Sequence, residues 1–117
     1  MAFSTEVTTP GSMYRYRLTD TVKRFTLRDN GFTETKAGNF QFLRPIEATP
    51  QAKDGFMLKI TVAKDLKTLK LSITSKNGMR AVNIFKDEKN KMIQDKFYFL
   101  LDGLVERGVL LKETIRR

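Results

Sequence analysis

One segment, residues 56–85, constrains the fold more than any other, because apolar and polar residues alternate in it through three successive runs. Residues that pair across neighbouring strands project from the same face of a sheet, so a correct pairing brings apolar residues together. A turn centred on Asp65-Leu66 meets this condition and gives three apolar pairs: Val62 with Leu69, Ile60 with Leu71 and Leu58 with Ile73.

A second turn, centred on Asn77-Gly78, continues the pattern, and Asn-Gly is a preferred two-residue hairpin turn. It places Thr74 opposite Ala81 on the outer face and gives two further apolar pairs on the same face as the first three: Ile73 with Val82 and Leu71 with Ile84. Because both turns make the same face apolar, the sequence predicts a three-stranded antiparallel meander over about residues 56–85.

The region of residues 88–107 predicts the principal helix. Its most apolar side chains recur at the helical period: Ile93, Phe97, Leu100, Leu101 and Leu104. Residues 87–90 offer caps, and Gly108 follows where a helix typically ends. Further apolar residues flank this stripe on both sides, so two sheets or a partner subunit must cover the helix. Among them, Tyr98 and Phe99 are candidate interface residues, and burial of both in the core is the alternative.

Shorter elements complete the predicted fold. Alternation in the segments FSTEVT and MYRYRLT predicts two N-terminal strands, with a turn at residues 10–12 between them. A short helix is expected over about residues 20–30, with Thr19 or Asp20 as its cap and Gly31 after its last turn. The segment FTETKAGNFQFLRP predicts a hairpin, and VLLKET predicts a final strand. Together these elements predict an α+β fold in which antiparallel sheets pack on the principal helix.

Composition limits the chemistry that the chain can perform. Its length suits a single domain, residues 1–117, and it contains neither Cys nor His. These absences remove thiolate nucleophiles, disulfides, the commonest general base and the commonest zinc ligand. The sequence also has no Gly-rich phosphate loop and no metal-ligand spacing. We therefore expect a non-catalytic protein without catalytic, cofactor-binding or metal-binding residues, and an enzyme whose residues meet only in the fold is a remaining alternative.

The ends and hydropathy of the chain bear on its location. The N-terminal segment MAFSTEVTTPG lacks the basic start and apolar run of a signal peptide. No window approaches the roughly 18 consecutive apolar residues of a membrane-spanning helix. Together with the absence of Cys, this predicts a cytoplasmic protein that does not bind a membrane.

Positive charge is unevenly distributed along the chain. The formal net charge is +9, and residues 53–91 hold ten basic and four acidic residues, an excess of +6. On the predicted meander, Lys59 and Lys70 project from the outer face, where they are candidate contacts for an anion or a partner. A sheet that binds single-stranded nucleic acid needs several stacking aromatics, and Phe85 is the one aromatic expected there. A solvated face is therefore the preferred interpretation, and nucleic-acid binding is the less favoured one.

A second set of basic residues lies in the strand predicted for MYRYRLT. Alternation places Tyr14 and Tyr16 on one face and Arg15 and Arg17 on the other. The planar guanidinium of arginine suits a carboxylate or a phosphate, so Arg15 and Arg17 are candidate anion contacts. A strand with its tyrosines packed inward and its arginines in water explains the same alternation and is favoured.

Three segments, LRDNGFTETKAGNFQFLRPI, LKITVAKDLKTLKLSIT and KFYFLLDGLVERGVL, resemble a small family of uncharacterised proteins from lactic-acid and related Gram-positive bacteria. The family is catalogued as a domain of unknown function and labelled with amino-acid metabolism. The resemblance spans nearly the whole chain and implies an α+β fold with antiparallel sheets around a principal helix. That fold has been likened to bacterial S-adenosylmethionine decarboxylases, which cleave themselves at a Glu-Ser bond. This chain has no Glu-Ser dipeptide, so the resemblance does not extend to that chemistry.

The resulting hypothesis is a cytoplasmic, non-catalytic domain that serves amino-acid or sulfur metabolism by binding a metabolite or a protein partner. A homodimer is expected, because the principal helix is apolar on more than one side. The alternative hypothesis is a basic protein associated with nucleic acid, which uses the lysine-rich face of the meander.

Overall fold

The computed structural model describes residues 3–8, 12, 14–46, 56–75, 81–85 and 91–115. Its elements in chain order are β1 (Glu6–Val7), β2 (Tyr14–Leu18), α1 (Arg24–Asp29), β3 (Thr33–Glu34), β4 (Phe40–Ile46), β5 (Phe56–Val62), β6 (Leu69–Ser75), α2 (Lys91–Glu106) and β7 (Leu110–Thr114). The predicted turns at residues 10–11 and 77–78 and the predicted caps at residues 87–90 lie outside the described residues.

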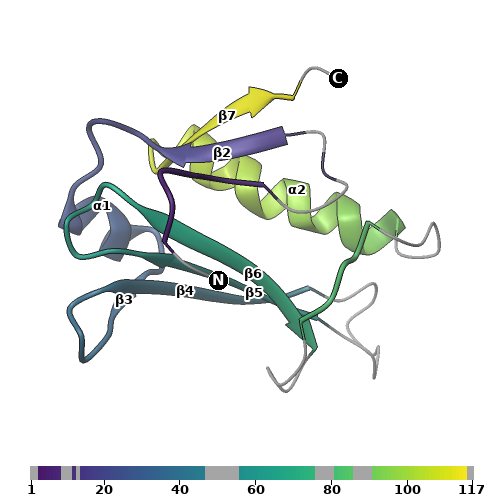
Figure 1. Cartoon of the computed structure of the whole chain (residues 1–117), viewed down its shortest axis with the longest axis horizontal. Helices are drawn as coiled ribbons and strands as arrows, with labels where there is room; N and C mark the ends of the chain where they lie inside the picture. Colours follow the sequence, from purple (N-terminus) through teal and green to yellow (C-terminus); the bar gives the residue numbers. More distant parts are fainter. Residues whose placement is uncertain are drawn as a thin grey trace.

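Two antiparallel sheets cover α2, and this arrangement confirms the predicted α+β fold. The larger sheet has the strand order β3-β4-β5-β6, and the smaller sheet has the order β1-β2-β7. Figure 1 shows α2 lying along the space between them, with β7 and β2 on one side and the larger sheet on the other. Two sheets of the same chain therefore account for most of the broad apolar surface of this helix.

The larger sheet confirms the predicted register of the first hairpin. Strands β5 and β6 pair Val62 with Leu69, Ile60 with Leu71 and Leu58 with Ile73. These six side chains are each at most 4% exposed. On the other edge of β5, β4 adds Phe40 and Phe42 to the same buried face. The alternation in the sequence was therefore sufficient to identify both the pairing and the buried face.

The third run of the predicted meander leaves the sheet after one residue pair, so its strand was predicted too long. Thr74 pairs with Ala81, as expected, but the residues after Ala81 form no strand. Ile84 is fully buried, and its carbonyl accepts a hydrogen bond of 2.8 Å from Gln94 Nε2 on α2. The Phe85 ring packs edge-on against Phe97 of the same helix, at 5.7 Å between centroids. Contacts with α2 thus replace further strand pairing.

Both helices end in the same glycine motif. Gly31 after α1 has a φ of +91°, and Gly108 after α2 has a φ of +80°. At each end, the amides of the glycine and of the next residue donate to the carbonyls three and five residues earlier. These are the two hydrogen bonds of the Schellman motif, in which glycine adopts the left-handed conformation without a steric penalty. The motif turns the chain out of each helix toward β3 and β7.

The short helix α1 begins later than predicted, at Arg24 instead of near residue 20. Its N-cap position is occupied by Lys23, whose side chain makes no capping hydrogen bond. Thr19, one of the predicted caps, instead donates from Oγ1 to the Gly108 carbonyl at 2.7 Å. Its amide also donates to the carbonyl of Val109 at 3.1 Å. Hydrogen bonds to the end of α2 therefore outweigh the local capping signal.

The core lies between the two sheets and α2. Its largest fully buried side chains are Tyr16, Leu27, Phe40, Ile46, Leu58, Ile60, Leu69, Ile84, Phe97, Leu101, Leu104 and Leu110. Every strand of more than two residues contributes at least one of them. Within the described ranges, neither helix is long and apolar enough to cross a lipid bilayer.

Candidate functional site

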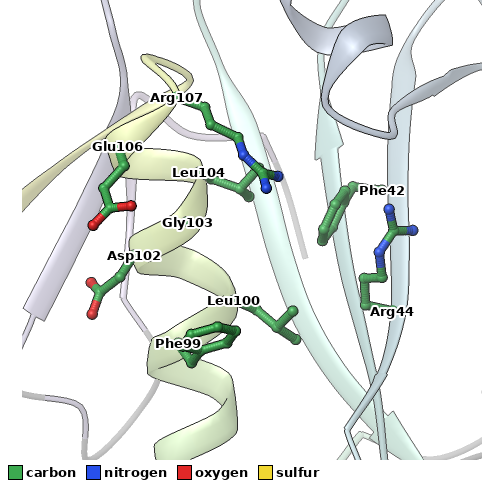
Figure 2. Close-up of a pocket in the computed structure, with 9 residues that line it drawn as sticks. All are labelled: Phe42, Arg44, Phe99, Leu100, Asp102, Gly103, Leu104, Glu106 and Arg107. Atoms are coloured by element: carbon green, nitrogen blue, oxygen red, sulfur yellow. The ribbon is translucent and has the colours of Figure 1, made fainter.

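A cleft of about 390 Å³ opens between α2 and β4. Small-molecule sites in proteins occupy roughly 300–1,000 Å³, so the cleft is large enough for a small metabolite. Nine residues line it: Phe42, Arg44, Phe99, Leu100, Asp102, Gly103, Leu104, Glu106 and Arg107. Figure 2 shows how their side chains lie on the two walls.

One wall is formed by one side of α2 together with Arg107, the residue that follows the helix. Leu100, Leu104 and Arg107 are separated by four and three residues, so helical geometry places them on the same flank. Figure 2 shows all three side chains directed across the cleft toward β4. The wall is therefore apolar in its depth and carries a guanidinium at the end of the helix. That position is favourable for a cation, because the C-terminal end of a helix has a partial negative charge.

The other wall is formed by Phe42 and Arg44 of β4, which project from the same face because they are two residues apart. The Arg44 guanidinium lies over the Phe42 ring, 4.5 Å from its centroid. Arg44 Nη1 also donates to the carbonyl of Leu43 at 2.8 Å. Stacking on an aromatic ring and a backbone hydrogen bond hold the guanidinium in place while leaving other N–H donors available.

Gly31 has no side chain, and the Arg44 guanidinium occupies the space where a side chain would lie. A Cβ atom at this position would clash with Arg44 Nη2. Because Nη2 is the far end of a flexible side chain and can shift, the constraint that favours glycine there is the positive φ of Gly31, which ends α1. The end of α1 is thus part of the arrangement that positions one cation of the cleft.

The lining of the cleft carries two positive and two negative side chains, which differ in where they point. Neither Arg44 nor Arg107 forms an ion pair with another described residue. The two acidic lining residues, Asp102 and Glu106, point away from the space between the walls in Figure 2. Asp102 Oδ1 accepts a hydrogen bond of 2.8 Å from Lys112 Nζ and is thereby compensated. The cleft therefore presents two guanidiniums above an apolar surface, an arrangement suited to a carboxylate or another planar anion.

The first predicted anion contacts, Arg15 and Arg17, lie away from this cleft. Arg15 Nη1 pairs with Glu6 at 3.1 Å, and Arg15 Nε lies 3.7 Å from Glu113. Both carboxylates belong to the smaller sheet, so the charge of Arg15 is compensated within its own surface. Arg17 lines a separate hollow of about 440 Å³ that also contains Glu6 and Asp20. This hollow has mixed charge and gives no clear preference for an anion.

The other predicted contacts, Lys59 and Lys70, lie on the outer face of the larger sheet. They line a small hollow of about 190 Å³ together with three neighbours, Thr61, Leu71 and Ser72. Lys70 Nζ lies 4.7 Å from the centroid of the Phe3 ring. Phe85, which was expected beside these lysines, packs inward against α2, so that expectation was wrong. A lysine-rich face that binds nucleic acid remains a prediction, and in the described residues its aromatic contact is Phe3.

The two candidate interface residues have different surroundings. Tyr98 is half-buried, and its ring meets Tyr14 edge-on at 5.4 Å and Phe85 at 5.5 Å. Phe99 is 78% exposed and lies at the rim of the cleft. Their role in an interface stays a prediction, and Phe99 has the accessible surface that such a role requires.

Tyr16 is a buried polar residue close to the other side of α2. It is 1% exposed, and its hydroxyl has no hydrogen-bond partner among the described residues. Burial raises the pKa of the Tyr16 phenol well above its ordinary value, and the charge of Asp102 raises it further. The phenol is therefore neutral over the physiological pH range, and we assign it a structural role.

Sequence reasoning missed both arginines of the cleft. Arg44 was part of a predicted hairpin, and Arg107 was the last residue of the predicted principal helix. An arginine two residues after Phe42 and another three residues after Leu104 are patterns that occur in many solvated surfaces. The described residues contain no group of three Asp, Glu, His or Cys side chains that could hold a metal ion.

Comparisons with known proteins agree with the resemblance seen in the sequence. The model of the DUF1831 family, described as "Putative amino acid metabolism", matches residues 1–111. The crystal structure of a DUF1831 family protein from Lactobacillus plantarum has 35% sequence identity to this chain and a TM-score of 0.85. That match covers 97% of this chain and 99% of the other. A search of curated proteins found no match.

Proposed function

The chain belongs to the DUF1831 family, and from this premise we propose that it binds a small carboxylate metabolite of amino-acid metabolism in the cleft between α2 and β4. One observation carries the proposal: Arg44 and Arg107, which have no ion-pair partner among the described residues, belong to opposite walls of one cleft that is also lined by apolar side chains. An uncompensated pair of guanidiniums beside apolar side chains is a typical feature of carboxylate recognition.

The charged and the apolar side chains of the cleft together indicate the class of ligand that we propose. The carboxylate of the ligand accepts hydrogen bonds from Arg44 and Arg107, and its apolar part lies against Phe42, Leu100 and Leu104. Such a ligand has one carboxylate and a short aliphatic body, like an apolar amino acid or the corresponding 2-oxo acid. Hydrogen bonds to charged groups each contribute about 1.5–3 kcal/mol, so two arginines support binding in the micromolar to millimolar range.

The orientation of Asp102 and Glu106 favours a 2-oxo acid over an amino acid as the ligand. An amino acid carries an α-ammonium group next to its carboxylate, which would place a third cation near the two guanidiniums. Asp102 and Glu106 point away from the space between the walls and do not face such a group. Like charges destabilise each other at short range, so the 2-oxo acid should bind more tightly than the amino acid.

We assign the protein a non-catalytic role in the cytoplasm. The absence of His and Cys from the chain supports a binding function over catalysis, because the commonest bases and nucleophiles are missing. The position of the two exposed cations supports a metabolite ligand over a protein partner, because both line the same concave surface.

Isothermal titration calorimetry with three matched compounds tests the proposal. We expect 4-methyl-2-oxopentanoate to bind, leucine to bind about tenfold more weakly, and leucinamide, which lacks a carboxylate, not to bind. Arg44→Gln and Arg107→Gln should each weaken binding of the 2-oxo acid about tenfold or more. Arg24→Gln, which removes an exposed arginine of α1 outside the cleft, is the matched control and should bind as the unmodified protein does. Absence of binding by all three compounds, or binding that survives both cleft substitutions, would contradict the proposal.

A further inference from the structure

The outer face of α2 carries two large apolar side chains that the chain itself does not cover. Phe99 is 78% exposed and Met92 is 58% exposed. They are seven residues apart, so they lie on the same side of the helix, opposite the buried face formed by Ile93, Phe97, Leu101 and Leu104. We call the face that includes Met92, Phe99 and Gly103 the outer stripe. Single exposed apolar side chains are normal, but large ones that gather on one side of a helix are candidates for an interaction site.

Gly103 creates a notch in the outer stripe, one turn after Phe99. A Cβ atom at this position would have no neighbour within 4 Å, so the space above the glycine is open. Glycine in the middle of a helix lowers helix stability relative to alanine, and no close packing among the described residues requires it here. The helix thus presents a protruding aromatic ring and an empty notch on the same stripe, separated by one turn.

We infer that a second copy of the chain packs antiparallel against the outer stripe, with each Phe99 seated over the partner's Gly103. A two-fold axis that crosses the outer stripe at the level of residue 101 pairs positions that are equidistant from that residue, so position 99 of each copy meets position 103 of the other. This arrangement is self-complementary, as the interface of a symmetric dimer must be. The protruding ring of each copy fills the notch of the other.

Charges on the stripe support the antiparallel arrangement. The same axis brings Lys96 opposite the partner's Glu106. This pair has opposite charge and occurs twice in the dimer. A parallel arrangement would instead place Asp95 against Asp95 and Glu106 against Glu106, which is repulsive, and would set the two Phe99 rings against each other. Charge and shape therefore favour the same geometry.

The expected dimer is weak and does not require the ligand. One pair of helices buries less than the roughly 1,200 Å² of a standard protein interface, so we expect a dissociation constant on the order of 100 µM. Phe99 and Gly103 also border the cleft, but dimer formation does not require an occupied cleft. Failure of the proposed metabolite binding would therefore leave this inference standing, and the reverse also holds.

Sedimentation equilibrium on the full chain, from about 10 µM to 1 mM, measures the association. Phe99→Ala should weaken it about tenfold or more, because it removes the ring from the interface. Gly103→Leu should weaken it at least as much by filling the notch, and should raise Tm by a few degrees, because leucine is the better helix former. These opposite effects distinguish loss of association from loss of folding. A chain that remains monomeric at 1 mM, or association that Gly103→Leu leaves unchanged, would overturn the inference.

Charge reversal tests the orientation of the two helices. Lys96→Glu and Glu106→Lys should each weaken association several-fold, and the double variant should recover most of the loss, because the pair is restored with opposite polarity. Lys91→Glu is the control, since it reverses a charge on the same helix outside the paired positions. If the double variant associates no better than the single variants, the antiparallel pairing is wrong.

Discussion

The two flanks of α2 differ in how far their side chains are packed and their charges are paired by the rest of the chain. On one flank, Tyr98 packs edge-on against Tyr14, and its hydroxyl lies 3.3 Å from Ser12 Oγ. Lys112 Nζ lies 3.9 Å from the centroid of the Tyr14 ring and pairs with Asp102 at 2.8 Å. On this closed flank, the described aromatic rings meet other rings and the charges are compensated.

The other flank is open. Leu100 and the buried Leu104 border the cleft between α2 and β4, and the two cations beside them, Arg44 and Arg107, have no ion pair with any described residue. The same helix therefore has one flank whose polar groups serve the fold and one whose polar groups do not. Side chains that the fold leaves uncompensated beside an apolar concave surface are the better candidates for function.

The sharpest test of the difference compares two neighbouring phenylalanines. Phe97→Ala should lower the free energy of unfolding by about 3–5 kcal/mol, because the ring is fully buried and its removal leaves a cavity. Phe99→Ala should change it by less than about 0.5 kcal/mol, because that ring is exposed. Urea denaturation at low micromolar concentration measures both. A large loss for Phe99→Ala would mean that the open flank is part of the folded core.

The buried phenol of Tyr16 makes the closed flank sensitive to high pH. Its pKa is raised above the ordinary value of 10.0, chiefly by burial, so the unfolded chain loses this proton at a lower pH than the folded chain does. The contribution of this phenol to the free energy of unfolding is therefore fully present below pH 10, and it decreases above pH 10 by up to about 1.4 kcal/mol per pH unit. We expect Tyr16→Phe to flatten the decrease in Tm above pH 10, measured by circular dichroism. An unchanged slope would contradict the buried, neutral phenol.

Removal of the ion pair on the closed flank should affect stability and not binding. Asp102→Asn leaves Lys112 without its partner, and because both side chains are partly exposed we expect a loss of about 0.5–1 kcal/mol. The loss should decrease with added salt, because salt screens exposed charges. Titration of this variant with the 2-oxo acid should match the unmodified protein. Weakened binding would place Asp102 in the ligand site and contradict the division between the flanks.

The smallest effect is expected on the lysine-rich outer face of the larger sheet. Fluorescence anisotropy with a single-stranded oligonucleotide at about 150 mM salt should give little or no binding, because the described aromatic contact of these lysines is Phe3 alone. The Lys59→Glu, Lys70→Glu double variant should then behave as the unmodified protein does. Tight binding that rises steeply at low salt and disappears in the double variant would make this sheet the functional surface.

Several features of the fold were predictable because they depend on local pattern. The register of β5 and β6 follows from alternation, since a shift by one residue would turn every apolar side chain toward water. The glycine ends of both helices were predictable for the same kind of reason, because few residues other than glycine adopt a positive φ easily. The family resemblance, which rests on such patterns over nearly the whole chain, was confirmed.

Features that depend on contacts distant in sequence were not predictable. Thr19 resembles a helix cap, but its hydroxyl bonds to the carbonyl of Gly108, 89 residues away. Phe85 was assigned to a strand, and its packing against α2 is a tertiary contact. The pairing of β7 with β2 joins the two ends of the chain, and nothing near either strand indicates its partner.

The sequence alone determined which faces of the strands and helices are apolar, because side-chain periodicity depends on backbone geometry within one element. Only the tertiary structure decided that Arg44 and Arg107, 63 positions apart in the chain, lie on opposite walls of one cleft. The reason is physical: a charge is compensated or left free by neighbours that folding brings together, and these neighbours leave no signal at the charged residue itself.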